Sequence, residues 1–408
     1  MVYETYCLGD VCNFIDYRGK TPPKATSGIP LITAKIIKSG KIQKPQEFIA
    51  ESYYDEWMRR GIPKKGSVIF TTEAPLGEVA RIHTNDKLAF AQRIIILEPK
   101  VKQLRSDYLF YALQDRILKN KIEARATGTT VTGIKAAELK KVEIDLPPLE
   151  IQERISSLLC SLDDKIELNN NINENLGKQA QAVFKSWFID NLNVGTWQLS
   201  TFSGLIEKTI SGDWGKDKPA GKSTEMVYCI RGADIPEVRA GNKGKMPIRY
   251  ILPKNYESKH LVAGDIVVEI SGGSPTQSTG RAAAISSALL NRYDKGMVCT
   301  NFCKAIKPKP GYSMYVYYYW QYLYDMGVFF SYENGTTGIK NLDINGFIET
   351  EPIHIAPKDL VEKFDNLCQS IFSKVYANGL ESERLAELRD ILLPKLMSGE
   401  INVSNLEV

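Results

Sequence analysis

The fold of this chain is decided by a stretch of sequence that occurs twice. It begins as Pro148-Leu149-Glu150-Ile151-Gln152-Glu153-Arg154-Ile155 and returns 209 residues later as Pro357-Lys358-Asp359-Leu360-Val361-Glu362-Lys363-Phe364. From each proline onward, apolar residues recur at intervals of three and four, which is typical of a helix with one apolar seam. Each copy therefore predicts a helix of about 35–40 residues, with proline in the first turn, where its missing N–H costs nothing.

The repeat continues upstream of the helices. Gly128-Thr129-Thr130 returns as Gly335-Thr336-Thr337, and Gly66-Ser67-Val68-Ile69-Phe70 is echoed by Gly264-Asp265-Ile266-Val267-Val268. Internal repetition of this length indicates a duplicated pair of domains rather than a solenoid. The expected order is a lobe over residues 1–147, a helix over 148–190, a second lobe over 191–356 and a second helix over 357–400.

The expected fold class is α+β, with an internal pseudo-two-fold repeat. Short runs rich in Val, Ile, Thr and Tyr, separated by Gly, Pro and Asn turns, predict two β-rich lobes. One aromatic helix is expected near the end of each lobe, at about 106–118 and 313–328. It is expected to pack in the core, and a platform on which bases stack is the alternative for Tyr315–Tyr324. The two long helices are expected to pair as an antiparallel coiled coil that separates the lobes. Asn169-Asn170-Asn171 and Gly177 weaken the first helix, Asn378-Gly379 could break the second, and Pro394 should bend its last turn.

Charge alternates along the chain in the same way. Residues 1–145 hold 24 Lys and Arg against 17 Asp and Glu (net +7), and residues 198–356 hold 18 against 15 (net +3). The helical stretches 146–190 and 357–408 each carry a net charge of −3, from 4 against 7 and 6 against 9. Two modestly basic lobes suit phosphate binding, and the acidic helices suit protein contacts.

The remaining composition points to a cytoplasmic protein. No apolar run is long enough to span a bilayer, and no secretory signal follows Met1. Seven irregularly spaced cysteines are typical of reduced thiols rather than a disulfide framework. Only three histidines are present, far apart in sequence, so neither a metal site nor a catalytic site is expected.

The whole chain resembles the specificity subunits of Type I restriction-modification systems. The residues that carry the resemblance are Arg18-Gly19-Lys20-Thr21-Pro22-Pro23, Gly128-Thr129-Thr130-Val131, Leu146-Pro147-Pro148-Leu149-Glu150-Ile151-Gln152 and the closing Leu388-Arg389-Asp390-Ile391-Leu392-Leu393-Pro394-Lys395-Leu396-Met397-Ser398-Gly399-Glu400-Ile401. The resemblance implies two target-recognition domains that each read half of a split double-stranded DNA target. It also implies helices that fix the gap and dock methyltransferase subunits, S-adenosylmethionine bound by those partners rather than by this chain, and a restriction subunit that completes the nuclease.

Candidate DNA contacts come from polar and basic loops. Hydroxyls and cations at matched points of the two lobes suit phosphate contacts, although a solvated turn or a helix cap is an equal alternative. Arg281 could pair with a guanine edge, and Arg81 lies in the corresponding stretch of the first lobe. The candidates are Arg18, Lys20, Thr21, Arg81, Thr129, Thr130, Lys135, Lys216, Lys243, Lys245, Arg249, Arg281, Thr336, Thr337 and Lys340.

Candidate partner contacts are apolar residues of the two long helices. They are Phe184, Trp187, Phe188, Leu392 and Leu396. For Trp187, burial in the coiled coil is the alternative. A different reading of the whole chain is a protein-protein scaffold with a coiled-coil spacer, and salt-sensitive binding of duplex DNA would separate the two.

Overall fold

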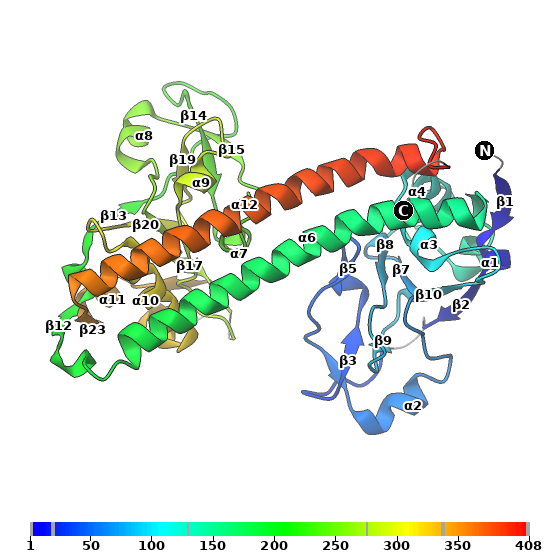
Figure 1. Ribbon diagram of the computed structural model, residues 1–408, viewed down its shortest axis with the longest axis horizontal. Coiled ribbons are helices and arrows are strands. Elements are labelled where there is room, and N and C mark those ends of the chain that lie inside the picture. Colours follow the sequence, from blue (N-terminus) through cyan, green and yellow to red (C-terminus); the bar gives the residue numbers. More distant parts are fainter. Residues whose placement is uncertain (1–2, 18–20, 129, 275, 336–338, 405–408) are drawn as a thin grey trace. The chain divides into compact units, whose positions relative to one another are not determined.

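The computed structural model describes residues 3–17, 21–128, 130–274, 276–335 and 339–404. The chain forms two compact units, residues 1–164 with 385–408 and residues 165–384. Each unit contains one β-rich lobe together with part of each long helix (Figure 1). The fold is therefore α+β, as expected from the sequence.

The first lobe contains eleven named strands and five short α-helices in the described part of the chain. The strands are β1 (Glu4–Cys7), β2 (Cys12–Asp16), β3 (Ile29–Ile32), β4 (Ile37–Lys38), β5 (Lys41–Ile42), β6 (Phe48–Ile49), β7 (Val68–Thr72), β8 (Leu76–Arg81), β9 (Ala89–Phe90), β10 (Ile94–Pro99) and β11 (Glu143–Leu146). The helices are α1 (Leu8–Val11), α2 (Tyr54–Trp57), α3 (Ser106–Ala112), α4 (Arg116–Glu123) and α5 (Ala136–Leu139).

The second lobe repeats this plan. Its strands are β12 (Gln198–Thr201), β13 (Ile206–Ser211), β14 (Glu225–Ile230), β15 (Ile248–Ile251), β16 (Ile266–Glu269), β17 (Ser271–Gly272), β18 (Ala282–Ala284), β19 (Met297–Cys299), β20 (Cys303–Pro308), β21 (Glu333–Asn334), β22 (Lys340–Leu342) and β23 (Pro352–Ile355). Its helices are α7 (Ile235–Arg239), α8 (Pro253–Lys259), α9 (Ser287–Leu290), α10 (Ser313–Asp325) and α11 (Ile344–Thr350).

The central sheets of the two lobes have the same topology. Strand order is β2-β10-β7-β8 in the first lobe and β13-β20-β16-β18 in the second, antiparallel throughout. A parallel pair accompanies each sheet, β3 with β9 and β14 with β19. The upstream echo in the sequence therefore corresponds to equivalent strands, β7 and β16. Strands β3 and β14 also occupy equivalent places in the two parallel pairs.

Each central sheet is buried on both faces. Val68 and Phe70 of β7 pack in a core with α3 and the long helices, while Ile69 between them packs in a second core with β3 and α2. In the second lobe, Ile266 and Val267 of β16 divide in the same way between two cores. Alternation of side chains along a strand explains why these strands have apolar residues in succession.

The aromatic helix of each lobe is a core element. Tyr315 and Trp320 of α10 are fully buried, as are Tyr108 and Tyr111 of α3, which confirms core packing. The first lobe differs from the expectation of one helix over 106–118. The side chain of Asp115 accepts a hydrogen bond from the backbone N–H of Ile117 and begins a separate helix, α4.

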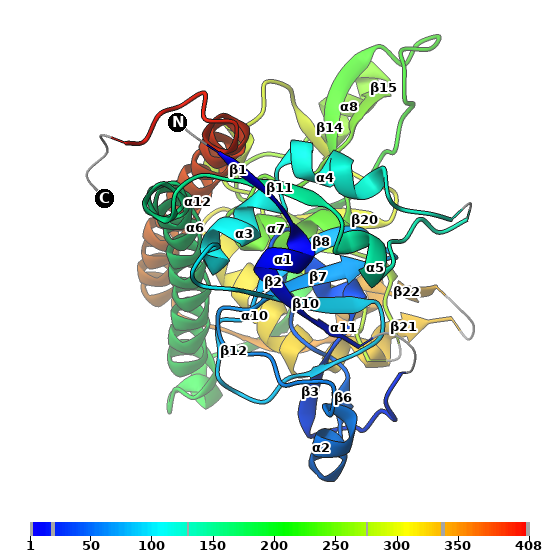
Figure 2. The same cartoon turned by 90° about the vertical axis from the view of Figure 1, so that its right-hand side faces the viewer.

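The two long helices are α6 (Leu149–Phe184) and α12 (Lys358–Met397), and neither is interrupted. They run side by side in both units, with the start of one against the end of the other (Figures 1 and 2). In the first unit Asp163 Oδ1 lies 2.6 Å from Arg389 Nη1, and in the second the rings of Phe184 and Phe364 lie 5.7 Å apart. The antiparallel pairing predicted from the sequence is confirmed.

A buried cluster of amides joins the two helices within the second unit. Asn169 Nδ2 lies 3.4 Å from Ser382 Oγ, and Asn378 Nδ2 donates to Asn173 Oδ1 at 2.8 Å. The two contacts are equivalent in the sequence repeat, because Ser382 is the counterpart of Asn173 and Asn378 is the counterpart of Asn169. Asn173 Nδ2 also donates to the backbone oxygen of Val375 at 2.9 Å. The asparagines that looked like helix breakers are therefore satisfied interhelical contacts.

Candidate nucleic-acid interface

Several loops of the first lobe meet at one end of its central sheet. The backbone N–H of Tyr17, just after β2, donates to Ile94 at 3.3 Å, where β10 begins. Thr72, at the end of β7, donates to the carbonyl of Arg93 at 2.9 Å and accepts from Ile134 at 3.0 Å. These bonds bring Tyr17, the 91–93 turn, the 73–75 loop that follows β7 and residues 130–135 together.

The second lobe builds the same arrangement. Asp213 N–H donates to Cys299 at 2.8 Å, and Ile270 N–H donates to Phe302 at 2.9 Å. Leu342 N–H in turn donates to Ile270 at 2.9 Å. The segments joined here are 212–218, 270–274 with 276–280, 300–302, and 333–335 with 339–341. We call these two loop groups the sheet-end surfaces of the first and second lobe.

The sheet-end surfaces contain many of the residues singled out by the sequence. Thr130, Lys135 and Lys216 are exposed on these segments, and Thr21 is exposed outside them. Arg18, Lys20, Thr129, Thr336 and Thr337 lie outside the described residues. Nothing in the structure tests DNA contact directly, so these assignments stay predictions.

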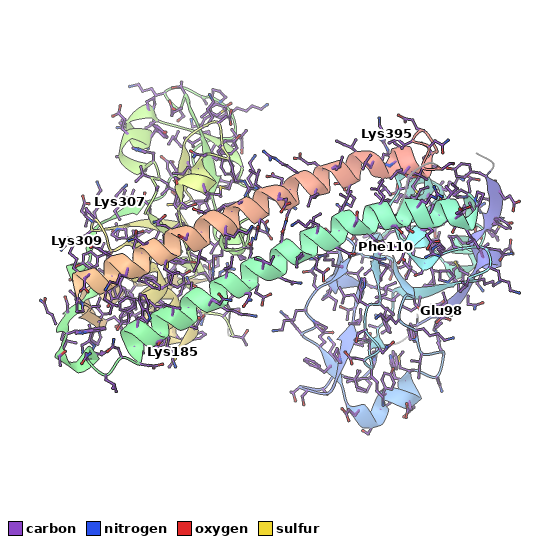
Figure 3. All side chains as sticks on the ribbon, in the orientation of Figure 1. Glu98, Phe110, Lys185, Lys307, Lys309 and Lys395 are labelled. Carbon is purple, nitrogen blue, oxygen red and sulfur yellow. The ribbon has the colours of Figure 1, made fainter. Side chains whose placement is uncertain are left out.

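Arg81 is used inside the first lobe. Its side chain is only 11% exposed, forms an ion pair with Asp107 and lies 4.8 Å from the ring centre of Phe110 (Phe110 is labelled in Figure 3). Burial alone would lower the pKa of Arg81, but neighbouring Cys160 and Asp107 raise it. The charge is compensated within the lobe, so the structure gives Arg81 a packing role that the sequence did not indicate.

Arg249 is likewise buried, and it supports a loop rather than presenting its own charge. Its guanidinium carbon lies 4.0 Å from the ring centre of Trp214, and its Nε donates to the Trp214 carbonyl at 2.8 Å. An ion pair with Asp217 completes the contact. Arg249 therefore holds the 212–218 loop, on which Lys216 is exposed.

Arg281 and Lys340 also have acidic partners. Arg281 donates from Nε and Nη2 to the two oxygens of Glu269, each at 2.7 Å, and these hydrogen bonds raise the pKa of Arg281. Lys340 Nζ lies 2.6 Å from Glu333 Oε2. Burial raises the pKa of Glu333, but Lys340 and Thr279 outweigh it and hold that pKa below its usual range.

These pairs stabilise the described part of the segment between β17 and β18. Thr279 donates from its backbone N–H and its hydroxyl to Glu333 Oε1, at 2.6 and 3.0 Å. Guanine recognition by Arg281 would require it to leave a bidentate carboxylate partner, so the structure favours a positioning role for this residue.

Lys243 and Lys245 lie on the turn that follows α7. Lys243 Nζ is 5.1 Å from the ring centre of Tyr293. The backbone N–H of Lys245 donates to Asp234 Oδ1 at 3.0 Å, and its side chain is exposed.

The candidate partner residues are largely core residues, which corrects the expectation drawn from the sequence. Phe184, Phe188 and Leu396 are fully buried in the lobe cores, whereas Trp187 and Leu392 are partly buried against them. An apolar seam that faces its own lobe cannot also be a docking surface. The long helices nevertheless expose other apolar side chains, notably Leu388 and Ile391 of α12.

Sequence reasoning missed several residues of the sheet-end surfaces. Arg93, Phe302, Trp214, Lys218 and Lys222 all lie on or beside these loops with exposed or half-exposed side chains. A signal for the 212–218 loop was present, because Gly19, Lys20 and Pro23 return 196 residues later as Gly215, Lys216 and Pro219.

The described part of the chain has no cluster of metal-binding side chains. Among those residues, no three His, Cys, Asp or Glu side chains gather as a metal site would require. Burial raises the pKa of the Cys229 and Cys303 thiols to about 12.

No described helix combines the length and apolar character needed to cross a bilayer.

Comparison with known proteins finds similarity to specificity subunits of Type I restriction enzymes. A family model described as the Type I restriction modification DNA specificity domain matches residues 2–178. The Type I restriction enzyme MjaIX specificity subunit of Methanocaldococcus jannaschii is 27% identical over 93% of this chain and 88% of its own length. The HindI specificity subunit of Haemophilus influenzae is 24% identical over 83% and 87%.

The fold has a solved counterpart. A crystal structure of a Type I restriction-modification S subunit from M. genitalium aligns over 97% of this chain and 96% of that one, with a TM-score of 0.55 and 16% identity. The duplicated lobes and the paired helices agree with these similarities, and the chain is similar over most of its length to specificity subunits of Type I restriction-modification systems.

Proposed function

We propose that this chain reads a bipartite double-stranded DNA target for a Type I restriction-modification complex, with one half-site for each lobe. The observation that carries the proposal is the duplicated sheet-end surface, in which Thr72 of the first lobe and Ile270 of the second make equivalent backbone hydrogen bonds. Two copies of one scaffold with different loop residues suit two different half-sites. The chain is the non-catalytic member of the complex.

The long helices set the gap between the half-sites and dock the methyltransferase subunits in this proposal. S-adenosylmethionine is bound by those partners, and a restriction subunit joins the complex in the cytoplasm. Leu388 and Ile391, which are 44% and 59% exposed and three residues apart on α12, supply an apolar docking patch. They replace the buried residues that the sequence suggested.

The test is binding of duplex DNA at several salt concentrations. DNA carrying the host's methylated motif should bind more tightly than scrambled DNA, and affinity should fall steeply with salt as counterions are released. Affinity is measured by fluorescence anisotropy with the chain bound to its methyltransferase subunits. The slope of log affinity against log salt concentration then gives the salt dependence. Salt-independent binding without preference for the motif would instead favour a protein-protein scaffold.

A further inference from the structure

One position in each lobe has the same place in the backbone but a different side chain. Arg93 and Phe302 are 209 residues apart, and each immediately precedes a central strand, β10 or β20. The carbonyl of each accepts a backbone hydrogen bond from the end of the neighbouring strand, at Thr72 in the first lobe and Ile270 in the second. The scaffold holds both residues at the sheet-end surface, so the difference between them lies in the chemistry that they present.

Arg93 presents a cation in a costly conformation. Its φ of 74° lies in the left-handed region, which residues other than glycine seldom adopt. Its Nε lies 2.7 Å from Glu73 Oε1, and the two side chains are 43% and 39% exposed. Glycine would fit this backbone without strain, whereas arginine here costs conformational energy, and such outliers are concentrated at binding and catalytic sites. Glu73 orients the guanidinium at the surface.

Phe302 presents an aromatic ring to solvent. It is 61% exposed, although most phenylalanines of this chain are buried. Its backbone is fixed on both sides, because its N–H donates to Thr300 Oγ1 at 3.2 Å and its carbonyl accepts from Ile270 and Ser271. An exposed ring on a fixed turn is suited to contact with an apolar feature of a partner surface.

We propose that Arg93 and Phe302 determine base specificity in their respective half-sites, an inference that rests on the proposed function. Arg93 reads a guanine through its O6 and N7 acceptors, which match the fork of the guanidinium. Phe302 reads a thymine through contact with its C5-methyl group, the apolar feature of the major groove. Each residue acts on one half-site only.

Arg93 is tested with two variants in a strain that expresses the complete modification complex. In Arg93→Gly the side chain is lost and the backbone strain is relieved, so the fold is not weakened. In Arg93→Lys the charge is kept and the fork is lost. Arg93→Gly should reduce discrimination at one guanine of the first-lobe half-site by roughly 5- to 100-fold, as read from methylation of host DNA by single-molecule sequencing. Arg93→Lys should reduce it less, because an ammonium group can still donate to guanine O6 and N7. Arg116→Ala, at an exposed arginine on α4, is the matched control.

Phe302 is tested in the same strain with Phe302→Ala. One A·T position of the second-lobe half-site should lose discrimination by roughly 5- to 50-fold, while the first half-site and the gap stay unchanged. Leu199→Ala, at an exposed apolar residue of β12, is the control for loss of surface area.

Three outcomes would overturn the inference. They are an unchanged motif in Arg93→Gly or Phe302→Ala, weaker methylation at every sequence with unchanged base preference in Arg93→Gly (which indicates a phosphate contact), and an equal loss over both half-sites. Failure of the proposed function is distinguishable, because the wild-type complex would then show no sequence preference at all.

Discussion

At the residue scale, the cations of this chain divide into those used internally and those presented on the surface. Arg81, Arg249, Arg281 and Lys340 each have a carboxylate partner within their own lobe. Lys307 of β20, labelled in Figure 3, is held in the same way, 3.2 Å from Asp265. A net positive lobe therefore presents fewer charges to a partner than its composition suggests.

The division predicts opposite results for Arg81 and Lys135. Arg81→Ala removes the partner of Asp107 and the cover of Phe110, so the first lobe should lose about 1–3 kcal/mol of unfolding free energy. Its DNA affinity should stay unchanged below the melting transition. Lys135→Ala, at an exposed site on the sheet-end surface, should leave stability unchanged and reduce the salt slope of DNA binding by about one.

Urea unfolding and anisotropy titrations of the same preparations check this pair. A folded Arg81→Ala variant with a reduced salt slope would show that Arg81 contacts phosphate after all.

At the scale of elements, Gly379 in the interior of α12 is explained by a contact with another element and not by the helix itself. A Cβ on Gly379 would lie 1.9 Å from the backbone oxygen of Gly241, on the turn after α7. Gly241 itself has a φ of 85°, and a Cβ there would lie 2.4 Å from the oxygen of Val375. The two glycines thus allow this turn to approach the helix closely. Arg292 stabilises the contact, because it donates to the backbone oxygen of Gly241 at 2.7 Å and to Glu383 of α12 at 2.5 Å.

We expect Gly379→Ala and Gly177→Ala to change stability in opposite directions. Alanine at 379 forces the turn away from α12 and should cost about 1–3 kcal/mol. Alanine at Gly177 of α6 meets nothing within 4 Å and should stabilise the protein by about 0.5–1 kcal/mol through better helix propensity.

Thermal melts of the two variants decide the matter, since both place the same residue inside a long helix. Equal stabilisation of both would mean that the contact of α12 with Gly241 is not formed in solution.

At the scale of the whole molecule, the pairing of the helices defines how a spacer could be lengthened without breaking the protein. Asn169 faces Ser382 and Asn173 faces Asn378. An insertion after Leu168 in α6 alone would therefore leave α12 unpaired. A matching heptad after Glu383 in α12 keeps both helices in register.

We predict that this paired insertion widens the non-specific gap of the methylated motif by about three base pairs. Seven helical residues add roughly 10 Å, and duplex DNA rises about 3.4 Å per base pair. Both half-site sequences should be retained, as read from the methylated motif in host DNA. A new half-site with the old gap would show that the helices contact bases and do not act as a spacer.

The sequence alone determined the features that depend on local residue patterns or on internal repeats. The 3–4 spacing of apolar residues after Pro148 and Pro357 predicted the long helices, and the matched Gly-Thr-Thr segments predicted the duplicated lobes. Both could be predicted because periodicity and repeats are visible in the sequence itself. The family resemblance rested on these same segments.

Only the tertiary structure decided which side chains are available. Phe184 was predicted to dock a partner and is buried, whereas Phe302 was passed over and is exposed. Whether a cation or an aromatic ring is buried or exposed depends on residues far away in the chain. Asp107 pairs with Arg81, and Ile270 holds the turn that carries Phe302. Those contacts form only when distant strands pair, and composition and spacing carry no record of them.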